Sequence, residues 1–404
     1  MRRISCAILM AAVCGCTETQ VTRPVDVSQA REALAGPAPE PRYQVEKIFP
    51  SLGGTLSVGR SINNLGLVAG LSTLPQNQTR EAVLWRDGQI VRLGTLGGPN
   101  SSVQWPGQND RGMIVGISQT AVDDTLGETW SCSAFLPFTG KTCVGFVWEA
   151  EDSVMKALPT LGGDNGFATG VNNRGQIVGW AETRVHDPTC NDPQVLQFRA
   201  VMWEPKKGRK TQLRPLMGDS ASAATAINDR GEVVGISGQC DVAVGRFSAL
   251  HSVLWKNGKP SELPNLGGEA WHTPMAINAK GDVVGFSNPP GATDGSFQVR
   301  AFLWTKKGGI QDLGRLKDDT TSQALGINSR LQVVGVSTSK AGINRAVLWQ
   351  GGVLYDLNKL AQPGFADSLV SAQHINEAGT ITGRLYEKST GKTLPFVATP
   401  IDPR

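Results

Sequence analysis

The sequence predicts an all-β fold, a seven-bladed β-propeller closed by an N-terminal strand that completes the last blade. Three observations predict it: a motif recurs seven times, turn signals divide each repeat into four short strands, and the last repeat has its fourth strand displaced to the N-terminal side. The chain has 404 residues, 40% of them hydrophobic, which is enough to bury the core of one large closed array. We therefore expect residues 43–404 to form a single propeller.

Each repeat begins at an asparagine followed by a glycine and a β-branched run, as in "INDRGEVVG" at 227–235. The Asn-x-x-Gly unit predicts a tight turn whose amide side chain caps the backbone and whose glycine takes the left-handed region. In the sixth repeat Leu331 replaces that glycine, at a cost of about 1 kcal/mol if the turn keeps its geometry. The seven asparagines lie 46 to 63 positions apart and are Asn63, Asn109, Asn172, Asn228, Asn278, Asn328 and Asn376.

An apolar segment that ends in tryptophan follows each of the first six turns, as in "AFLW" at 301–304. The seventh repeat has "LPFVATP" there, and we place Phe396 in the tryptophan position. A second tight turn and a strand that ends near a Gly-Gly pair complete most repeats. Four strands per repeat are typical of a propeller blade, and the structural alternative is an open β-solenoid.

Circular closure separates these alternatives. The seventh repeat ends after its third strand, while "KIFPSLGG" at 47–54 resembles "KALPTLGG" at 156–163, which ends an internal fourth strand. We predict that the strand beginning at residue 43 pairs with "LPFVATP" in the last blade. A closed propeller uses such a permutation and an open solenoid does not, so the propeller is favoured.

The sequence also resembles a known repeat family. The combination of Ile-Asn-x-x-Gly-x-Val-Val-Gly, Ala-Phe-Leu-Trp at 301–304 and Leu-Gly-x-Leu-Gly-Gly at 93–98 resembles the bacterial HAF extracellular repeat family, and the likeness covers residues 43–399. The resemblance implies export and a propeller-like repeat, and it implies no reaction.

The N-terminal segment predicts export and a lipid anchor. Arg2 and Arg3 precede an apolar run that is too short for a permanent membrane span, so residues 1–15 are interpreted as a signal peptide. The segment "VCGC" at 13–16 resembles a bacterial lipobox, which implies lipidation of Cys16; the alternative is an ordinary cleaved signal. By the same resemblance, Thr17 favours the outer membrane. Residues 16–42 are polar and Pro-rich, and we expect a flexible tether that holds the propeller at the outer membrane, the cell surface or the periplasm.

Four cysteines remain after the signal segment, and an even number suits disulfides in an oxidising compartment. Cys132 and Cys143 fall in one loop of the second repeat. Cys190 and Cys240 fall in corresponding loops of adjacent repeats. We predict the pairs Cys132–Cys143 and Cys190–Cys240.

Candidate ligand-binding residues lie on the face that carries the variable loops. Acidic residues follow the fourth strands of five repeats, and carboxylates converging on the central channel would suit a basic ligand or Ca²⁺. The alternative is solvated turn residues that bond locally. These residues are Asp164, Asp219, Glu269, Asp318, Asp319 and Asp367.

Aromatic side chains provide a second candidate site. Trp105 and Trp271 lie near the start of innermost strands, where a flat ring could bind a sugar, although each could instead fill a gap in its own blade. His272 is beside Trp271, and the histidines lie in different repeats without zinc-ligand spacing, so no metal site is predicted. His374 lies in an inner strand and is expected to be a hydrogen-bonded core residue.

Composition and motifs narrow the function. The net charge is +4 with Lys and Arg scattered singly, so nucleic acid is excluded as an expected partner. The sequence contains no nucleophile elbow, phosphate-binding loop or zinc-protease motif. The first hypothesis is a monomeric interaction module that binds an envelope protein or glycan and touches the membrane through its anchor. The alternatives are a carbohydrate binder or adhesin, and a hydrolase or lyase centred on His272.

Overall fold

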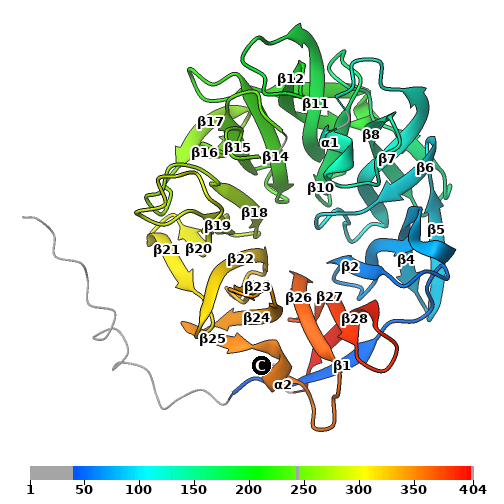
Figure 1. Ribbon diagram of the computed structural model, residues 1–404, viewed down its shortest axis with the longest axis vertical. Coiled ribbons are helices and arrows are strands. Elements are labelled where there is room, and N and C mark those ends of the chain that lie inside the picture. Colours follow the sequence, from blue (N-terminus) through cyan, green and yellow to red (C-terminus); the bar gives the residue numbers. More distant parts are fainter. Residues whose placement is uncertain (1–39, 129, 243–244, 402–404) are drawn as a thin grey trace, which may run out of the picture. The chain divides into compact units, whose positions relative to one another are not determined.

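The computed structural model describes residues 40–401, except residues 129 and 243–244 (Figure 1). The predicted signal peptide at 1–15, the predicted lipidation site Cys16 and all of the tether before residue 40 lie outside the described residues. The described part contains seven antiparallel sheets of four strands each, arranged as a seven-bladed β-propeller. The predicted fold class is therefore confirmed.

The first strand of each blade lies innermost in Figure 1. The strands of blades 1 to 4, from the inside outward, are β2 (Ser57–Ile62), β3 (Val68–Thr73), β4 (Arg80–Arg86) and β5 (Gln89–Gly94); β6 (Gly97–Ser102), β7 (Met113–Asp123), β8 (Lys141–Glu149) and β9 (Met155–Ala157); β10 (Gly166–Val171), β11 (Ile177–His186), β12 (Leu196–Glu204) and β13 (Arg209–Leu213); and β14 (Ala221–Ile227), β15 (Val233–Gly238), β16 (His251–Lys256) and β17 (Lys259–Leu263).

The strands of blades 5 to 7 follow the same order, and the last blade ends with the first strand of the chain. They are β18 (Thr273–Ile277), β19 (Val283–Ser287), β20 (Arg300–Thr305) and β21 (Gly309–Gly314); β22 (Asp319–Ile327), β23 (Val333–Ser339), β24 (Asn344–Gln350) and β25 (Val353–Asp356); and β26 (Ser368–Ile375), β27 (Ile381–Glu387), β28 (Lys392–Pro400) and β1 (Tyr43–Lys47). The short helical segments are η2 (Pro75–Asn77), α1 (Trp130–Ser133), η3 (Pro205–Lys207) and α2 (Leu357–Leu360).

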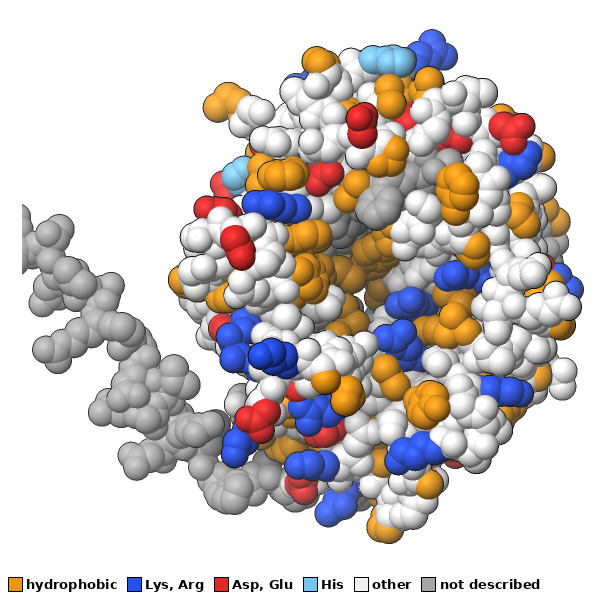
Figure 2. Space-filling model, in the orientation of Figure 1, with side chains coloured by type: hydrophobic (Ala, Val, Ile, Leu, Met, Phe, Trp, Pro, Cys, Tyr) orange, Lys and Arg blue, Asp and Glu red, His pale blue; other side chains and the backbone are white. Residues whose placement is uncertain are grey.

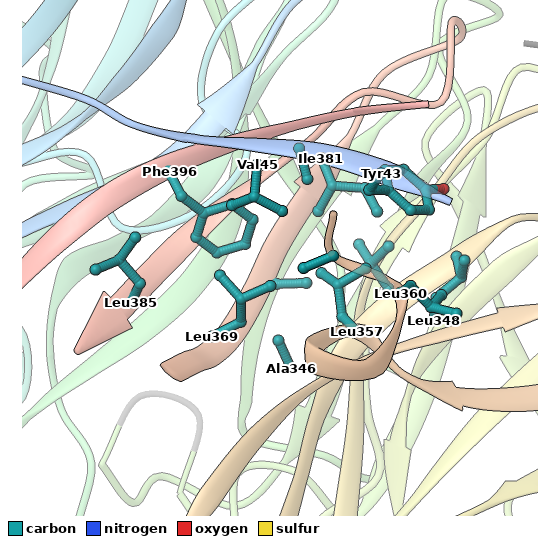
Figure 3. Close-up of a cluster of buried hydrophobic side chains, with 14 of the residues drawn as sticks. Tyr43, Val45, Ala346, Leu348, Leu357, Leu360, Leu369, Ile381, Leu385 and Phe396 are labelled. Atoms are coloured by element: carbon teal, nitrogen blue, oxygen red, sulfur yellow. The ribbon is translucent and has the colours of Figure 1, made fainter. Parts of the chain in front are cut away.

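Strand β1 closes the ring as predicted. It pairs antiparallel with β28, from Tyr43 opposite Pro400 to Lys47 opposite Phe396. Tyr43 and Val45 point into a buried cluster with residues of α2 and blade 7, as Figure 3 shows. Alternate side chains of a strand face opposite sides. Strand β1 can therefore bury its apolar face in this cluster while its backbone pairs with the edge of β28.

The predicted position of Phe396 in the last blade was wrong. In the other blades, the tryptophan of the third strand lies opposite the first residue of the β-branched run, as Trp349 lies opposite Val333. In blade 7 the residue opposite Ile381 is Ala398, and Phe396 lies opposite Gly383. Phe396 therefore matches Phe146 of blade 2, which lies opposite Gly116. The motif "LPFVATP" contains no tryptophan, so the sequence lacked the landmark that fixes the register.

The recurring tryptophans connect neighbouring blades. In four blades the indole Nε1–H donates to a backbone carbonyl at the end of the preceding blade's fourth strand. The bonds run from Trp85 to Pro50 (2.9 Å), Trp203 to Pro159 (2.9 Å), Trp255 to Arg214 (2.7 Å) and Trp349 to Leu313 (2.7 Å). Each ring thus fills the gap between two blades while its polar group is satisfied.

The recurring asparagines form a closed ring. The side-chain Oδ1 of Asn228 accepts bonds from the backbone N–H of Arg230 and Glu232, which caps the turn as predicted. Its Nδ2 donates to the backbone oxygen of the next blade's asparagine, and the same bond recurs in all seven blades. The distances are 3.2 Å (Asn63 to Asn109), 3.0 Å (Asn109 to Asn172), 3.0 Å (Asn172 to Asn228), 3.1 Å (Asn228 to Asn278), 3.2 Å (Asn278 to Asn328), 3.1 Å (Asn328 to Asn376) and 3.1 Å (Asn376 to Asn63).

Leu331 keeps the turn geometry of the glycine it replaces, with φ of 59°. Leu331 therefore carries the left-handed strain that the sequence predicts.

Among the described residues, no helix is long and apolar enough to cross a membrane.

Candidate functional site

The propeller has two unlike faces. The turn face carries the seven asparagine turns, six of which have the glycine and one of which has Leu331. The loop face carries the connections between blades and the loops between second and third strands, including α1. The central channel opens on the loop face as a hollow in Figure 2.

A β-bulge in the first strand places a side chain at the channel cavity in four blades. In six blades the strand pairing skips one residue, three positions before the turn asparagine, and a bulge of this kind re-aims the side chain of the unpaired residue. The skipped residues are Arg60, Thr169, Thr225, Met275, Leu325 and Gln373. Blades 1, 5, 6 and 7 thereby contribute Arg60, Met275, Leu325 and Gln373 to one cavity.

This channel cavity has a volume of about 360 Å³. Its walls come from five blades and combine aromatic, aliphatic and uncharged polar side chains with two arginines, Arg60 and Arg384. No carboxylate lines it in the described part of the chain. Figure 2 shows basic side chains beside the hollow on the side of blades 1 and 7 and hydrophobic side chains within it.

The two arginines are incompletely paired. Arg60 donates from Nη1 to Oε1 of Gln373 at 2.8 Å. The Nε atoms of Arg60 and Arg384 are buried, and neither finds an acceptor among the described residues. Burial, and then the positive charges of Arg384 and Arg80, lower the pKa of Arg60 to about 10. Arg60 therefore remains charged at neutral pH, and burial also lowers the pKa of Arg384.

Trp105 lies at the wall of this cavity, but it follows β6 and does not precede the innermost strand as the sequence predicted. Only 7% of it is exposed, and its ring meets Phe135 at 5.4 Å and Phe167 at 5.3 Å edge-on. Its buried Nε1–H has no acceptor among the described residues. The ring therefore belongs to an aromatic cluster, and it adds one more unmatched donor to the same cavity.

The predicted acidic residues do not converge on the channel, and none lines the cavity. Asp319 is buried and bonds to Arg345 and, at 2.5 Å, to Ser337 of its own blade. Asp219 accepts from Ser237 at 2.5 Å, and Asp367 lies 3.0 Å from Nζ of Lys47. The remaining three, Asp164, Glu269 and Asp318, are exposed.

Asp319, Asp219 and Asp367 are therefore better described as turn residues that bond locally than as ligands of the channel. Their partners are side chains of the same blade. The described residues contain one group of close metal-ligand types, Asp187 with Cys190 and Cys240. The two cysteines form a disulfide, so they are not thiolate ligands.

Trp271 and His272 also lie away from the cavity. The Trp271 Nε1–H donates to the oxygen of Gly295 at 3.0 Å, and its ring packs edge-on against Phe297. His272 is 1% exposed; its Nδ1 is 2.8 Å from Oγ of Ser287, and its Nε2 is 3.2 Å from the oxygen of Gly268. Burial lowers the pKa of His272 to about 4, so the ring is neutral at physiological pH. Neither ring nitrogen is open to a substrate.

His374 is a hydrogen-bonded inner-strand residue, as predicted. Its Nδ1 accepts the backbone N–H of Ile62 at 3.1 Å.

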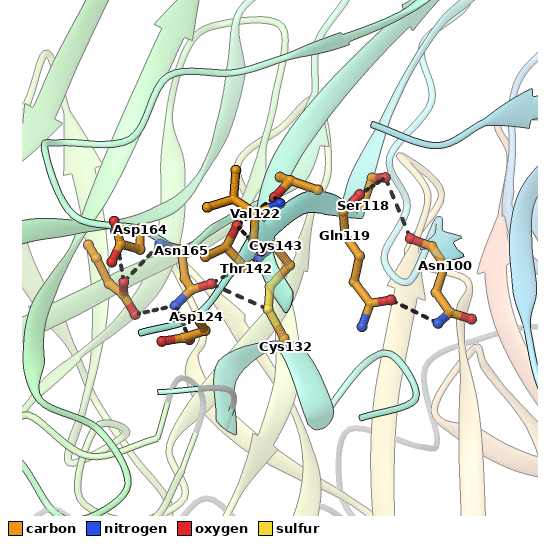
Figure 4. The surroundings of a disulfide bond; sticks show 12 residues. Asn100, Ser118, Gln119, Val122, Asp124, Cys132, Thr142, Cys143, Asp164 and Asn165 are labelled. Atoms are coloured by element: carbon orange, nitrogen blue, oxygen red, sulfur yellow. Dashed lines mark hydrogen bonds between the residues drawn. A yellow bond between two sulfur atoms is a disulfide. The ribbon is translucent and has the colours of Figure 1, made fainter. Parts of the chain in front are cut away.

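Both predicted disulfides are present on the loop face. Cys132 of α1 is bonded to Cys143 of β8, and Cys190 is bonded to Cys240 across blades 3 and 4. Figure 4 shows that Asn165 lies against the first disulfide. Its Oδ1 accepts the N–H of Cys143 at 2.9 Å, and its Nδ2 donates to Asp124 at 3.2 Å.

A pair of buried glutamates joins the loops of blades 2 and 3, and sequence reasoning missed it. Glu128 is 0% exposed and Glu182 is 2% exposed. Gln194 Nε2 donates to both, at 3.2 Å to Glu128 and 3.0 Å to Glu182. Burial, and then the charge of Glu128, raise the pKa of Glu182 to about 8. Nothing in the local sequence marks this pair, because Glu128 of blade 2 finds its partners Gln194, Val195 and Leu196 in blade 3.

The same loops expose apolar side chains. Phe138 is 70% exposed and Val122 is 64% exposed in blade 2; Val185 is 51% exposed in blade 3 and Phe297 is 43% exposed in blade 5. Of these residues, Phe138 lies in the loop that the Cys132–Cys143 disulfide closes, whereas Phe297 lies in a blade 5 segment without a cysteine.

The sheets and their order define the described part of the chain as a seven-bladed β-propeller. No protein-family model and no curated protein matches the sequence. Among solved structures, the chain is similar to Pyrococcus horikoshii acylaminoacyl peptidase, at 12% identity and a TM-score of 0.50, over 86% of this chain and 52% of that one. It is also similar to Porphyromonas gingivalis dipeptidyl peptidase 4, at 9% identity, a TM-score of 0.41, and 85% and 52% coverage.

A third similar structure is the polysaccharide lyase Uly1, at 8% identity and a TM-score of 0.43, over 93% of this chain and 96% of that one. The chain spans about half the length of the two peptidases. At these identities the similarity shows the fold alone, and the fold hosts many unrelated functions.

Proposed function

We propose that the protein is an exported, lipid-anchored β-propeller that binds an envelope protein through the loop face of blades 2 to 5. The observation that carries the proposal is the exposed Phe138, in the loop that the Cys132–Cys143 disulfide closes, together with Val122 and Val185 exposed in blades 2 and 3. A free surface loop would lose conformational entropy on binding, and a cross-linked loop loses less. The loop face is thus preorganised for a partner.

Export and anchoring are supported by separate features. The disulfides suit an oxidising compartment outside the cytoplasm. The signal segment and Cys16 support lipidation, and the repeat motifs support membership of the HAF family. A lipid anchor would hold the module at the membrane without a spanning helix.

Substitution of Phe138 by serine tests the interaction. The Phe138→Ser variant should capture several-fold less of a specific partner from envelope extracts than the unchanged protein does, because a central apolar anchor contributes about 2 kcal/mol or more. The matched control is Leu65→Ser, since Leu65 is 69% exposed on the turn face. The measurement is quantitative mass spectrometry of proteins cross-linked to each variant.

Both variants should keep the melting temperature, because both side chains are exposed. Equal capture by the Phe138 and Leu65 variants would contradict the assignment to the loop face. Cell fractionation tests the lipid anchor. The unchanged protein should be recovered with the membranes, and the Cys16→Ser variant should be recovered in the soluble fraction.

A further inference from the structure

The channel cavity contains positive charge without a negative partner. Arg60 and Arg384 both line it, no carboxylate lines it in the described part of the chain, and each arginine has a buried Nε without an acceptor there. Like charges in a partly desolvated space repel, and an unmatched buried donor costs about 1–3 kcal/mol. The fold alone gains nothing from this arrangement.

Apolar residues would satisfy the fold at one of these positions. Arg384 follows the glycine of β27, and the residues that follow the corresponding glycines are Ile236 in β15 and Val336 in β23. Both equivalents are buried core residues. Arg60 is the bulged residue of β2, where blades 5 and 6 have Met275 and Leu325. The position of Arg384 is thus apolar in these other blades, while the bulge position of Arg60 is apolar in blades 5 and 6 and polar in blades 3, 4 and 7.

The two arginines are held in place by the scaffold. They come from strands of adjacent blades, since β2 packs against the last blade, and Arg60 is fixed by its bond to Gln373 of β26. Guanidinium groups bind carboxylate and phosphate through paired N–H donors. The geometry provides such donors without a mobile loop.

The rest of the wall suits a hydroxyl-rich molecule. Uncharged amides and a hydroxyl, among them Gln104, Gln323 and Ser371, lie around the cavity with Trp105 and Phe135. Amide side chains can both donate to and accept from hydroxyls, and an aromatic ring can pack against the C–H groups of a sugar. A volume of about 360 Å³ falls within the range of small-molecule pockets.

We propose that the channel cavity binds a small anionic sugar, a sugar acid or a sugar phosphate, with its oxyanion between Arg60 and Arg384 and its ring near Trp105. The cavity shares Phe135 with the disulfide-closed loop of blade 2, but its ligand is a small molecule, so the proposal goes beyond the function proposed above. The carboxylate and the phosphate share the same recognition chemistry, and the test distinguishes them.

Isothermal titration calorimetry on the full chain in detergent compares four probes at equal ionic strength: glucuronate, glucose 6-phosphate, glucose and inorganic phosphate. At least one of the charged sugars should bind, and the stronger of the two identifies the oxyanion. Glucose and inorganic phosphate should each bind at least about tenfold more weakly, because each lacks half of the recognised chemistry. Equal binding of glucose, equal binding of inorganic phosphate, or no binding of either charged sugar would overturn the proposal.

Three variants locate the binding site. Arg60→Gln and Arg384→Gln should each weaken binding at least about tenfold, since each removes a charge-assisted contact. Neither should lower the melting temperature of the free protein, because each relieves repulsion. Gln373→Glu keeps the shape and places a carboxylate beside Arg60, so it should compete with the ligand and abolish binding.

The matched control is Arg300→Gln. Arg300 also has a buried Nε without an acceptor among the described residues, but it lies near Asp312 in blade 5 and does not line the cavity. This variant should bind the charged sugar as the unchanged protein does. Binding that survives Gln373→Glu, or that is lost equally in Arg300→Gln, would overturn the site.

Discussion

At the scale of single residues, the environment of a carboxylate decides its charge. Glu182 is buried in β11, beside Glu128 of the blade 2 loop, and accepts the backbone N–H of Asn165 at 2.8 Å. The donors around it favour the ionised form, while burial and the neighbouring carboxylate oppose it more strongly and raise its pKa to about 8. The loop junction is therefore sensitive to pH between the unfolded and folded pKa values of this group.

The sign of this dependence follows from linkage. The folded pKa of Glu182 is about 8 and its ordinary value is 4.5, so folding favours the protonated form. Its contribution to stability is complete below pH 4.5 and is lost as the pH rises through 8. We expect the free energy of unfolding to fall by an amount on the order of a few kcal/mol across that range.

Denaturant unfolding of Glu182→Gln at several pH values tests this prediction. The variant cannot ionise at this position, so its pH slope between 5 and 8 should be flatter, whatever its absolute stability. The control is Glu46→Gln, an exposed position on β1. A Glu182→Gln slope equal to that of the unchanged protein would refute the assignment.

At the scale of elements, β1 is the strand on which closure depends. Strand β1 lies more than 340 positions before its partner, β28, in the sequence. A side chain also holds it in place, because Oε1 of Gln362 accepts the backbone N–H of Val45 at 2.8 Å. Burial alternates along the strand, with Tyr43 and Val45 inside and Gln44 and Glu46 outside. The face of β1 that contains Tyr43 and Val45 therefore provides its stabilising apolar contacts.

Removal of residues 43–49 should destabilise the whole propeller and promote aggregation, because it exposes the edge of β28 and the apolar cluster beneath it. A milder test is Val45→Asp, which places a charge in that cluster and should cost about 3 kcal/mol or more. Thermal unfolding with light scattering reports both effects. Gln44→Asp on the outer face is the matched control, and an equal loss in both substitutions would contradict the packing of β1.

At the scale of the whole molecule, the asparagine ring couples every blade to the next. A blade that unfolds breaks two bonds of the ring and uncovers the faces of both neighbours. We therefore expect one cooperative transition for the described propeller, although the sequence is built of repeats whose energies add in open arrays.

Asn328→Ala tests the ring. It removes the bond from Nδ2 to Asn376 and the caps that Oδ1 gives to Arg330 and Gln332, at a cost of about 2–4 kcal/mol. Calorimetry should show one transition that moves as a whole to lower temperature. The control, Ser329→Ala, changes a half-buried neighbour in the same turn and removes only its hydroxyl bond to Glu377. A separate low-temperature transition in Asn328→Ala would show that the blades unfold independently.

The sequence by itself determined the number of blades, their strand order, the closing strand and the two disulfide pairs. Each of these follows from a local pattern that repeats, because the period of the motif, the chemistry of the turn and the position of a loop are properties of short segments. The register of Phe396 was the exception, since the last repeat lacks the tryptophan that marks it.

The tertiary structure alone decided which side chains meet. Arg60 and Arg384 are more than 320 positions apart and share a cavity only because the ring closes between them. The predicted acidic residues lie apart because their nearest partners are within their own blades, and Glu128 meets Glu182 across a blade boundary. Contacts across the axis depend on the curvature of the closed ring, and no short segment encodes that curvature.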